Sequence, residues 1–208
     1  SESIIVGREW LGLYTPVMHS DEGLDLFRKY GALLEGHFVL SSGLHTSGYL
    51  QCARVLQHPK HAEIVGSALA QRLIDYKPAV VLSPALGGVI IGHEVARSLG
   101  VRAIFAERRD GQLTLRRGFY FEQGERVLVV EDVVTTGGST RETIDVAAEA
   151  GGAVVGAAAI IDRGEEPVRF EVPFDALVRM SLPAYEVTEC PQCAAGESLT
   201  KPGSRAST

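Results

Sequence analysis

The side chains best suited to chemistry lie in residues 127–140, which read V-L-V-V-E-D-V-V-T-T-G-G-S-T. Two adjacent acids, Glu131 and Asp132, follow four apolar residues and precede a run of threonine, glycine and serine. Small residues let backbone N–H groups converge on an anion at the start of a helix, and hydroxyls add further donors. Acids in front of such a loop would repel a phosphate, so we expect them to face sugar hydroxyls or a ligand-held cation. The stretch therefore suits a ribose 5-phosphate.

The same stretch indicates the elements that position these side chains. Residues 127–130 have the length and the β-branched content of a buried parallel strand. Helical spacing of apolar residues over 141–150, followed by Gly151-Gly152, indicates a helix and its end. The chemistry thus lies on a strand-to-helix turn. Taken alone, Gly137-Gly138 also suits a plain tight turn with solvated acids, and these residues by themselves leave that choice open.

The composition narrows the class of protein. A length of 208 residues fits one domain, residues 1–208, with enough chain for a full core. The net charge of −6 argues against general nucleic-acid binding, which needs a basic face. No run of about 18 apolar residues occurs, so we expect no membrane span. Residues 1–10 lack the basic-then-apolar order of a secretory signal.

Three cysteines are too few for a disulfide framework, which favours a reducing cytoplasm. Two of them, Cys190 and Cys193, form a C-x-x-C pair, which is half a zinc site or a redox motif. No second pair is visible, and the usual strand-helix context of a redox motif is missing. We therefore expect two reduced thiols in a C-terminal turn.

Strands and helices alternate through the middle of the chain. Short apolar runs predict strands over residues 79–82, 101–106, 153–161 and 176–180, and helical spacing predicts helices over 59–76 and 89–99. This alternation predicts an α/β fold with a mostly parallel sheet and helices on both faces.

Nearer the N-terminus, the pattern predicts a helix and two short strands. Apolar residues at helical spacing indicate a helix over 24–34. Strands are expected over 38–40 and 49–52, with a polar loop over 41–48 between them.

Residues 127–140 resemble the phosphoribosyl-pyrophosphate (PRPP) motif of type I phosphoribosyltransferases, with an apolar strand, two acids, two aliphatics and a Thr/Gly-rich phosphate loop. The order F-x-L-x-S-G followed by S-x-Y, over residues 38–49, resembles the hood of orotate phosphoribosyltransferases. In that family the hood closes over the pyrimidine ring. The resemblance implies the type I fold, with a hood over about 20–55 plus a C-terminal segment, and a core over about 60–165.

The resemblance also assigns roles to single residues. It implies that PRPP is bound by Glu131, Asp132, Val133, Val134, Thr135, Thr136, Gly137, Gly138 and Ser139. Glu131 and Asp132 would hold the ribose diol and serve catalysis, and Thr135 and Arg163 would bind orotate. The alternative for Arg163 is a salt bridge with a neighbouring acid. Mg²⁺ would be held mainly by PRPP, without direct protein ligands.

Arginine is concentrated in residues 107–118, E-R-R-D-G-Q-L-T-L-R-R-G, around a D-G turn. In the resembled family this hairpin covers the pyrophosphate, often from the neighbouring subunit of a homodimer. Arg108 and Arg109 match the start of the family pattern, which implies a catalytic role. Arg116 and Arg117 are candidates by charge alone, and a solvated ribbon with surface arginines is the alternative.

The chain departs from the family pattern at three places. Ser41 stands where a hood lysine is common, and Leu86 and Gly87 replace an aromatic and a lysine in the loop that contacts pyrophosphate. The arginine hairpin is short and lacks the usual Lys and His. The ending K-P-G-S-R-A-S-T resembles that of a subgroup with the same short hairpin.

The function that the resemblance implies is an enzymatic transfer of ribose 5-phosphate from PRPP to orotate, giving orotidine 5′-phosphate and pyrophosphate for pyrimidine biosynthesis. One alternative is a purine-base phosphoribosyltransferase with the same PRPP loop. Another is a non-catalytic nucleotide-sensing regulator on the same fold. The acidic composition speaks against a nucleic-acid-binding regulator.

Overall fold

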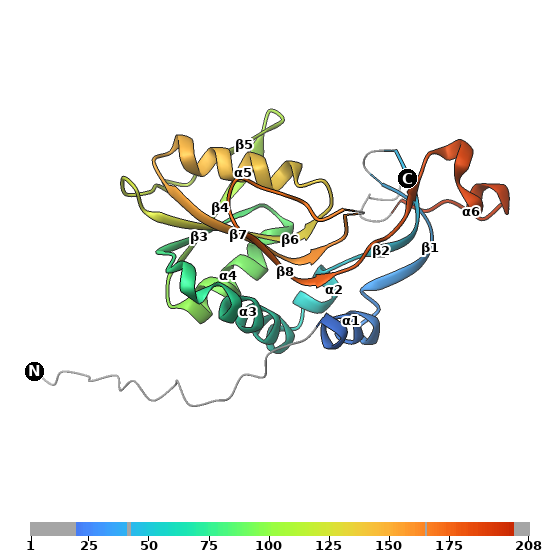
Figure 1. Ribbon diagram of the computed structural model, residues 1–208, viewed down its shortest axis with the longest axis horizontal. Coiled ribbons are helices and arrows are strands. Elements are labelled where there is room, and N and C mark those ends of the chain that lie inside the picture. The colour runs from blue at the N-terminus through green and yellow to red at the C-terminus, as the bar shows by residue number, and fades with distance from the viewer. Residues whose placement is uncertain (1–19, 41–42, 165, 202–208) are drawn as a thin grey trace, which may run out of the picture.

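A six-stranded sheet forms the centre of the computed structural model, which describes residues 20–40, 43–164 and 166–201 (Figure 1). Its strands, in spatial order, are β5 (Gln112–Leu115), β4 (Arg102–Arg109), β3 (Val80–Pro84), β6 (Arg126–Val134), β7 (Ala153–Asp162) and β8 (Phe174–Arg179). All neighbours are parallel except β4 and β5, which form a hairpin. The predicted mostly parallel sheet is therefore confirmed.

Helices cover both faces of this sheet, as Figure 1 shows. The longer ones are α1 (Ser20–Lys29), α3 (Pro59–Leu73), α4 (Gly87–Leu99) and α5 (Gly138–Glu149); α2 (Ala53–Leu56) is a single turn, and a 3₁₀ turn (Ile74–Tyr76) extends α3. None of the helices in the described ranges is both long and apolar enough to cross a membrane.

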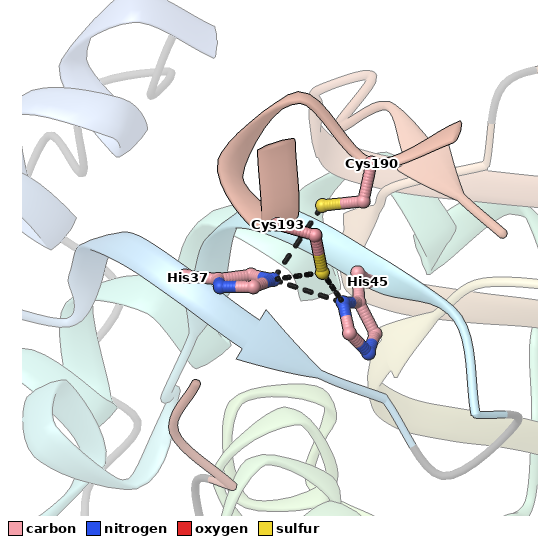
Figure 2. A group of neighbouring side chains, drawn as sticks. All are labelled: His37, His45, Cys190 and Cys193. Carbon is pink, nitrogen blue, oxygen red and sulfur yellow. Dashed lines mark hydrogen bonds between the residues drawn. The ribbon is translucent and has the colours of Figure 1, made fainter. Parts of the chain in front are cut away.

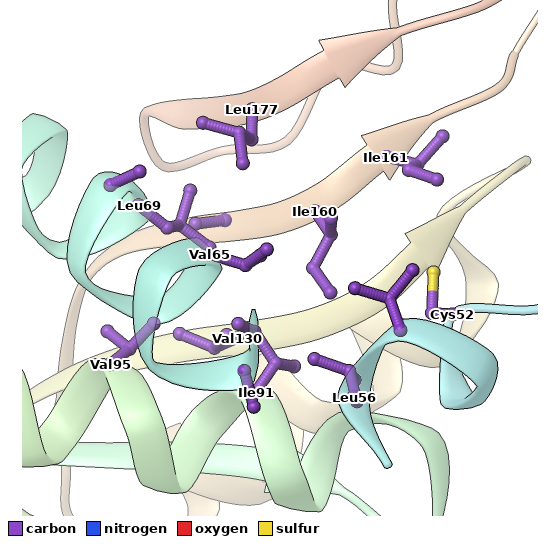
Figure 3. Packing of buried hydrophobic residues seen from close by; sticks show 14 of the residues in the cluster. Cys52, Leu56, Val65, Leu69, Ile91, Val95, Val130, Ile160, Ile161 and Leu177 are labelled. Atoms are coloured by element: carbon purple, nitrogen blue, oxygen red, sulfur yellow. The ribbon is translucent and has the colours of Figure 1, made fainter. Parts of the chain in front are cut away.

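Successive side chains of β6 point to opposite faces of the sheet, so the sheet has a hydrophobic core on each face. Val130 belongs to the larger cluster, together with Leu69 of α3 and Ile91 of α4 (Figure 3). Val127 belongs to the cluster on the opposite face, together with Ala147 of α5. Because β6 is buried on both faces, its apolar run is continuous rather than alternating, as the sequence indicates.

A second, smaller antiparallel sheet lies at one end of the molecule, and we call it the hood sheet. It consists of β1 (Leu33–Val39), β2 (His45–Leu50) and β9 (Ala184–Tyr185), in the order β1-β2-β9. The tail segment, residues 186–201, then passes through a 3₁₀ turn (Val187–Glu189) and α6 (Pro191–Ala194) and returns to β1. Assignment of the whole chain to one domain stays a prediction.

The N-terminal elements differ from their predicted bounds. The helix predicted over 24–34 ends at Lys29, because Gly31 takes a left-handed conformation (φ +59°) and Leu33 already pairs with Leu50 in the hood sheet. Part of the polar loop predicted over 41–48 is strand β2, which begins at His45. Alternation in these short strands is too weak to fix their ends without their partners.

Candidate active site

The phosphate-binding turn joins β6 to α5. Val127 to Val130 are fully buried, and the strand continues to Val134. Helix α5 begins at Gly138, three residues before the predicted start at residue 141, so only residues 135–137 form the turn. The exposed hydroxyls of Thr135, Thr136 and Ser139 lie around this helix N-terminus, which suits an anion.

Gly137 is required by this turn for two reasons. It caps α5 with a left-handed backbone (φ +79°), and a Cβ there would lie 2.8 Å from Cγ1 of Val168. Gly138, by contrast, has room, since its Cβ would lie 3.9 Å from the Thr136 hydroxyl. The turn thus requires glycine at position 137, whereas position 138 has room for a side chain.

The two acids at the end of β6 form a coupled pair. Burial, followed by the charge of Asp132, raises the pKa of Glu131 to about 8, while a hydrogen bond from Ser139 opposes the rise. Burial also raises the pKa of Asp132, but hydrogen bonds from Glu131 and from the Val133 backbone N–H (2.9 Å) favour its ionised form. The arrangement therefore has a protonated Glu131 donating to an ionised Asp132, so the pair carries about one negative charge near neutral pH.

The two aliphatic residues after the acids, Val133 and Val134, have different surroundings. Val133 lines a cavity of about 270 Å³ between the turn and the hood sheet. Val134 is buried, and its carbonyl accepts a hydrogen bond from the Arg163 backbone N–H (2.9 Å). The predicted contribution of Val134 to PRPP binding is therefore confined to its backbone.

Arg163 lies in the same cavity as Asp132. Its Nε donates a hydrogen bond to the Thr135 hydroxyl (2.7 Å), and burial lowers the pKa of Arg163. The alternative for Arg163 was a salt bridge to Asp162 or Glu165. Asp162 instead approaches Nε of Arg179 at 4.0 Å, and Glu165 lies outside the described residues. Arg163 and Thr135, both predicted to bind orotate, therefore stand side by side.

The cleft between the hood sheet and the turn also holds residues to which the sequence assigned no individual role. The 270 Å³ cavity is lined by Tyr49 of β2 and by Lys201 of the tail segment. An adjoining cavity of about 430 Å³ shares Thr135 and Arg163 and is bordered by Glu186. The ending that resembles a short-hairpin subgroup was the only signal for Lys201, because its position depends on contacts across most of the chain.

The loop after β3 approaches the acids. Leu86 is exposed, and a Cβ on Gly87 would lie 2.6 Å from Oδ1 of Asp132. A side chain at position 87 would therefore require the Asp132 carboxylate to move.

The arginine hairpin divides into paired and exposed side chains. The predicted D-G turn is present, with positive φ at both residues. Arg108 donates to Glu142 of α5 (2.7 Å) and to the Gly111 carbonyl, and Arg117 makes a forked contact with Glu107 (2.7 and 2.8 Å). Arg109 is 68% exposed, and its Nε lies 3.5 Å from the carboxylate of Asp110, which is 91% exposed. Arg116 is exposed as well.

The structure corrects the expectation for the C-x-x-C pair. Cys190 and Cys193 do not stand alone in a turn, because their sulfur atoms meet His37 and His45 of the hood sheet (Figure 2). The other two members of the group are histidines rather than a second cysteine pair, and they lie about 150 residues away in the sequence.

Comparison with known proteins identifies the family. Residues 51–173 match the model of the phosphoribosyl transferase domain. The chain is 49% identical, over 90% of its length and 99% of the relative, to orotate phosphoribosyltransferase of Caldanaerobacter subterraneus, and 52% identical, over 90% and 100%, to that of Heliobacterium modesticaldum. The crystal structure of the Aeropyrum pernix orotate phosphoribosyltransferase superposes with a TM-score of 0.61 at 26% identity, covering 74% of this chain and 92% of that one. The chain belongs to the orotate phosphoribosyltransferase family.

Proposed function

We propose that this chain transfers ribose 5-phosphate from PRPP to N1 of orotate. The bond from C1 of the ribose to pyrophosphate breaks, pyrophosphate leaves with the bonding electrons, and a C1–N1 bond forms as N1 gives up its proton. The observation that carries the proposal is the shared cavity of Asp132 and Arg163 beside the phosphate-binding turn. It provides for a sugar phosphate and an anionic base within one cleft.

The phosphate-binding turn would hold the 5-phosphate. Backbone N–H groups at the start of α5 and the hydroxyls of Thr135, Thr136 and Ser139 are exposed there. Asp132 and Glu131 would bind the ribose diol, where a neutral Glu131 can donate and an ionised Asp132 can accept. The single negative charge of the pair would also stabilise the developing cationic sugar, which is where catalysis of this bond cleavage needs electrostatic help.

Arg163 would pair with the orotate carboxylate. Its hydrogen bond to Thr135 holds the guanidinium between the turn and the hood sheet, while Tyr49 and Lys201 line the same cavity. Lys201 supplies a further positive charge to this cavity.

Mg²⁺ fits this site as an ion carried by the substrate. The Asp132 carboxylate is a hard oxygen ligand, and among the described residues no group of three or more carboxylates gathers around it into a protein cage. Mg²⁺ commonly keeps substrate phosphates and water as its main ligands, and when bound here it would neutralise the leaving pyrophosphate.

A homodimer with an exchanged arginine hairpin would complete the pyrophosphate site. Arg108 and Arg117 are engaged within their own chain, whereas Arg109 and Arg116 are exposed and could reach a neighbouring subunit. The assignment of Arg108 is thereby weakened, and we assign the capping role to Arg109 with Arg116.

The absence of disulfides among the three cysteines supports a reducing cytoplasm.

Subunit complementation tests the exchange. Asp132→Asn chains are mixed, through partial unfolding and refolding, with chains carrying Arg109→Ala and Arg116→Ala. If the hairpin acts in the neighbouring subunit, half of the dimers regain one intact site, and activity returns to about a quarter of the wild-type value. A mixture as inactive as its parents would overturn the exchange.

The reaction itself is tested by product identification. PRPP, orotate and Mg²⁺ are incubated with the protein, and nucleotide and pyrophosphate are quantified separately. We expect orotidine 5′-phosphate and pyrophosphate in equal amounts. Tight nucleotide binding without any product would instead indicate a regulator, and would overturn the proposal.

A further inference from the structure

Four metal-binding side chains converge at the outer edge of the hood sheet, away from the cavity of Asp132. His37 comes from β1, His45 from β2, and Cys190 and Cys193 from the start and the end of one turn of the tail segment (Figure 2). One nitrogen or sulfur atom of each lies within 4.8 Å of all the others. This is the only such group of three or more ligands among the residues that the structure describes.

The distances between these atoms are close to those of a tetrahedral site. Zinc bonds of about 2.0 Å to nitrogen and 2.3 Å to sulfur place tetrahedral ligands about 3.3 Å apart for two nitrogens and about 3.6 Å apart for nitrogen and sulfur. Nε2 of His37 and Nδ1 of His45 are 2.9 Å apart. The nitrogen-to-sulfur distances are 3.5 Å and 3.6 Å from His37 to Cys190 and Cys193, and 3.3 Å from His45 to Cys193. The four atoms therefore surround a space of the size of one metal ion.

The surroundings hold the ligands in place. Nδ1 of His37 lies 3.0 Å from the Glu197 carbonyl, so the proton belongs on Nδ1 and the Nε2 lone pair points at the two sulfurs. His37, His45 and Cys190 are each no more than 4% exposed. Apart from that carbonyl contact the four ligand atoms face one another, and buried imidazoles and thiols are costly to leave without a compensating charge or bond.

The tail segment has little else to hold it. Most of its residues from Pro191 to Thr200 are exposed, so it buries little apolar surface. Backbone hydrogen bonds join Thr200 to His37 and Val39 (2.8 and 3.0 Å), and the Gln192 amide donates to the Gly36 carbonyl. A short segment with so few buried apolar contacts needs a further cross-link to offset its conformational entropy.

We propose that His37, His45, Cys190 and Cys193 form a structural zinc site that clamps the tail segment onto the hood sheet. Two thiolates and two imidazoles in tetrahedral array are a ligand set that selects zinc, and all four positions are taken by protein, so no position remains open for catalysis. The clamp has a functional consequence, because the tail segment ends at Lys201 in the cavity of Arg163. The zinc thus positions one wall of the base-binding cleft without touching the substrate.

Metal analysis of the untagged protein tests this site directly. We expect about one zinc per chain in wild type, and less than about a tenth of that in Cys193→Ser and His45→Ala. Cys52→Ala is the matched control, since Cys52 is buried beside the Asp132 carbonyl, far from the cluster, and its loss leaves the zinc in place. Wild-type protein without zinc after growth and purification with added zinc would overturn the proposal, as would stoichiometric iron or a Cys190–Cys193 disulfide.

A second measurement works even if the variants do not fold. Co²⁺ is exchanged into wild-type protein, and its visible spectrum is recorded. Tetrahedral coordination with two thiolates gives intense ligand-field and thiolate-to-cobalt bands, which zinc then abolishes. Absence of these bands would contradict a site built from both sulfurs.

The clamp is also testable through substrate affinity, a result that rests on the proposed function. Removal of the metal by chelator is expected to raise KM for orotate about tenfold, and KM for PRPP less than about twofold, because Lys201 shares its cavity with Arg163, the proposed partner of the orotate carboxylate. Metal content and the cobalt spectrum report on the site even if the activity proves different. Equal effects on the two KM values would contradict the positioning role.

Discussion

The two sides of the cleft are built in opposite ways. The phosphate-binding turn is one contiguous stretch, set between a strand buried on both faces and the helix that follows it. The hood side is assembled from residues far apart in the chain: the contact from His37 to the Glu197 carbonyl spans 160 positions. One side is held by the core of the parallel sheet, and the other by hydrogen bonds, a short strand pairing and the His/Cys cluster.

This difference separates the chemistry of the sugar phosphate from recognition of the base. A rigid turn can stabilise a transition state, since its donors are fixed before the substrate arrives. A discontiguous wall can be altered without touching that turn, and so it can set which base is accepted. Mutations on the two sides are therefore expected to change different kinetic constants.

The largest effect is expected at Asp132, on the rigid side. Asp132→Asn removes the negative charge beside the developing cation and is expected to lower kcat at least about 100-fold, with the fold intact. Steady-state rates and a thermal melt measure both parts. Asp145→Asn, an exposed position on α5, is the control and keeps normal turnover. Wild-type kcat in Asp132→Asn would remove the proposed diol role.

The next largest effect is expected at Arg163, which follows β7 and lies between the turn and the hood sheet. Arg163→Ala deletes the charge that pairs with the orotate carboxylate and is expected to raise KM for orotate about 30-fold, with KM for PRPP within about twofold. Arg179→Ala, whose guanidinium lies near Asp162, serves as the control. If both KM values rise together at Arg163, the division between the two sides is wrong.

The phosphate-binding turn contains a matched pair of glycines for a test of rigidity. Gly137→Ala is expected to lower the free energy of unfolding by about 2 kcal/mol, because of the positive φ and the contact with Val168. Gly138→Ala, with space for a Cβ, is expected to change it by less than about 0.5 kcal/mol. Denaturant unfolding of both variants measures these changes, and equal losses of unfolding free energy would contradict the described turn.

The smallest effect is expected from the buried acid, and it depends on pH. The fold raises the pKa of Glu131 from about 4.5 to about 8, so the unfolded chain ionises first as pH rises. The folded protein therefore loses stability progressively between these values. Glu131→Gln avoids the loss and is expected to be more stable than wild type at pH 8, with a smaller advantage at pH 5. An advantage that is equal at the two pH values would show that Glu131 is not held protonated.

The sequence predicted most of the parallel core, because its strands and helices are specified by local apolar periodicity. It also predicted the turn residues, which are contiguous. The predicted N-terminal helix ends too late, because Leu33 and Leu34 continue its helical spacing. In the structure both residues belong to β1 and pair with β2. Local patterns carry no information about such pairing.

For the same reason, only part of the candidate site could be predicted from the sequence. Arg108 was predicted to cap pyrophosphate by its place in a motif, but its ion pair with Glu142 of α5 depends on how the hairpin folds back. Lys201 and the joining of Cys190 and Cys193 with two histidines depend on the return of the tail segment to the hood sheet. Charge and spacing identify candidate residues, and the tertiary fold decides which of them meet.

The preference for orotate over a purine base is tested most directly by comparing the bases as substrates. With PRPP and Mg²⁺ at fixed concentrations, kcat/KM is measured for orotate, adenine, hypoxanthine and guanine. Because a half-buried arginine without a carboxylate partner disfavours the purines, we expect a preference for orotate of at least about 1,000-fold. Turnover of a purine base at a rate equal to that of orotate or above it would contradict the account.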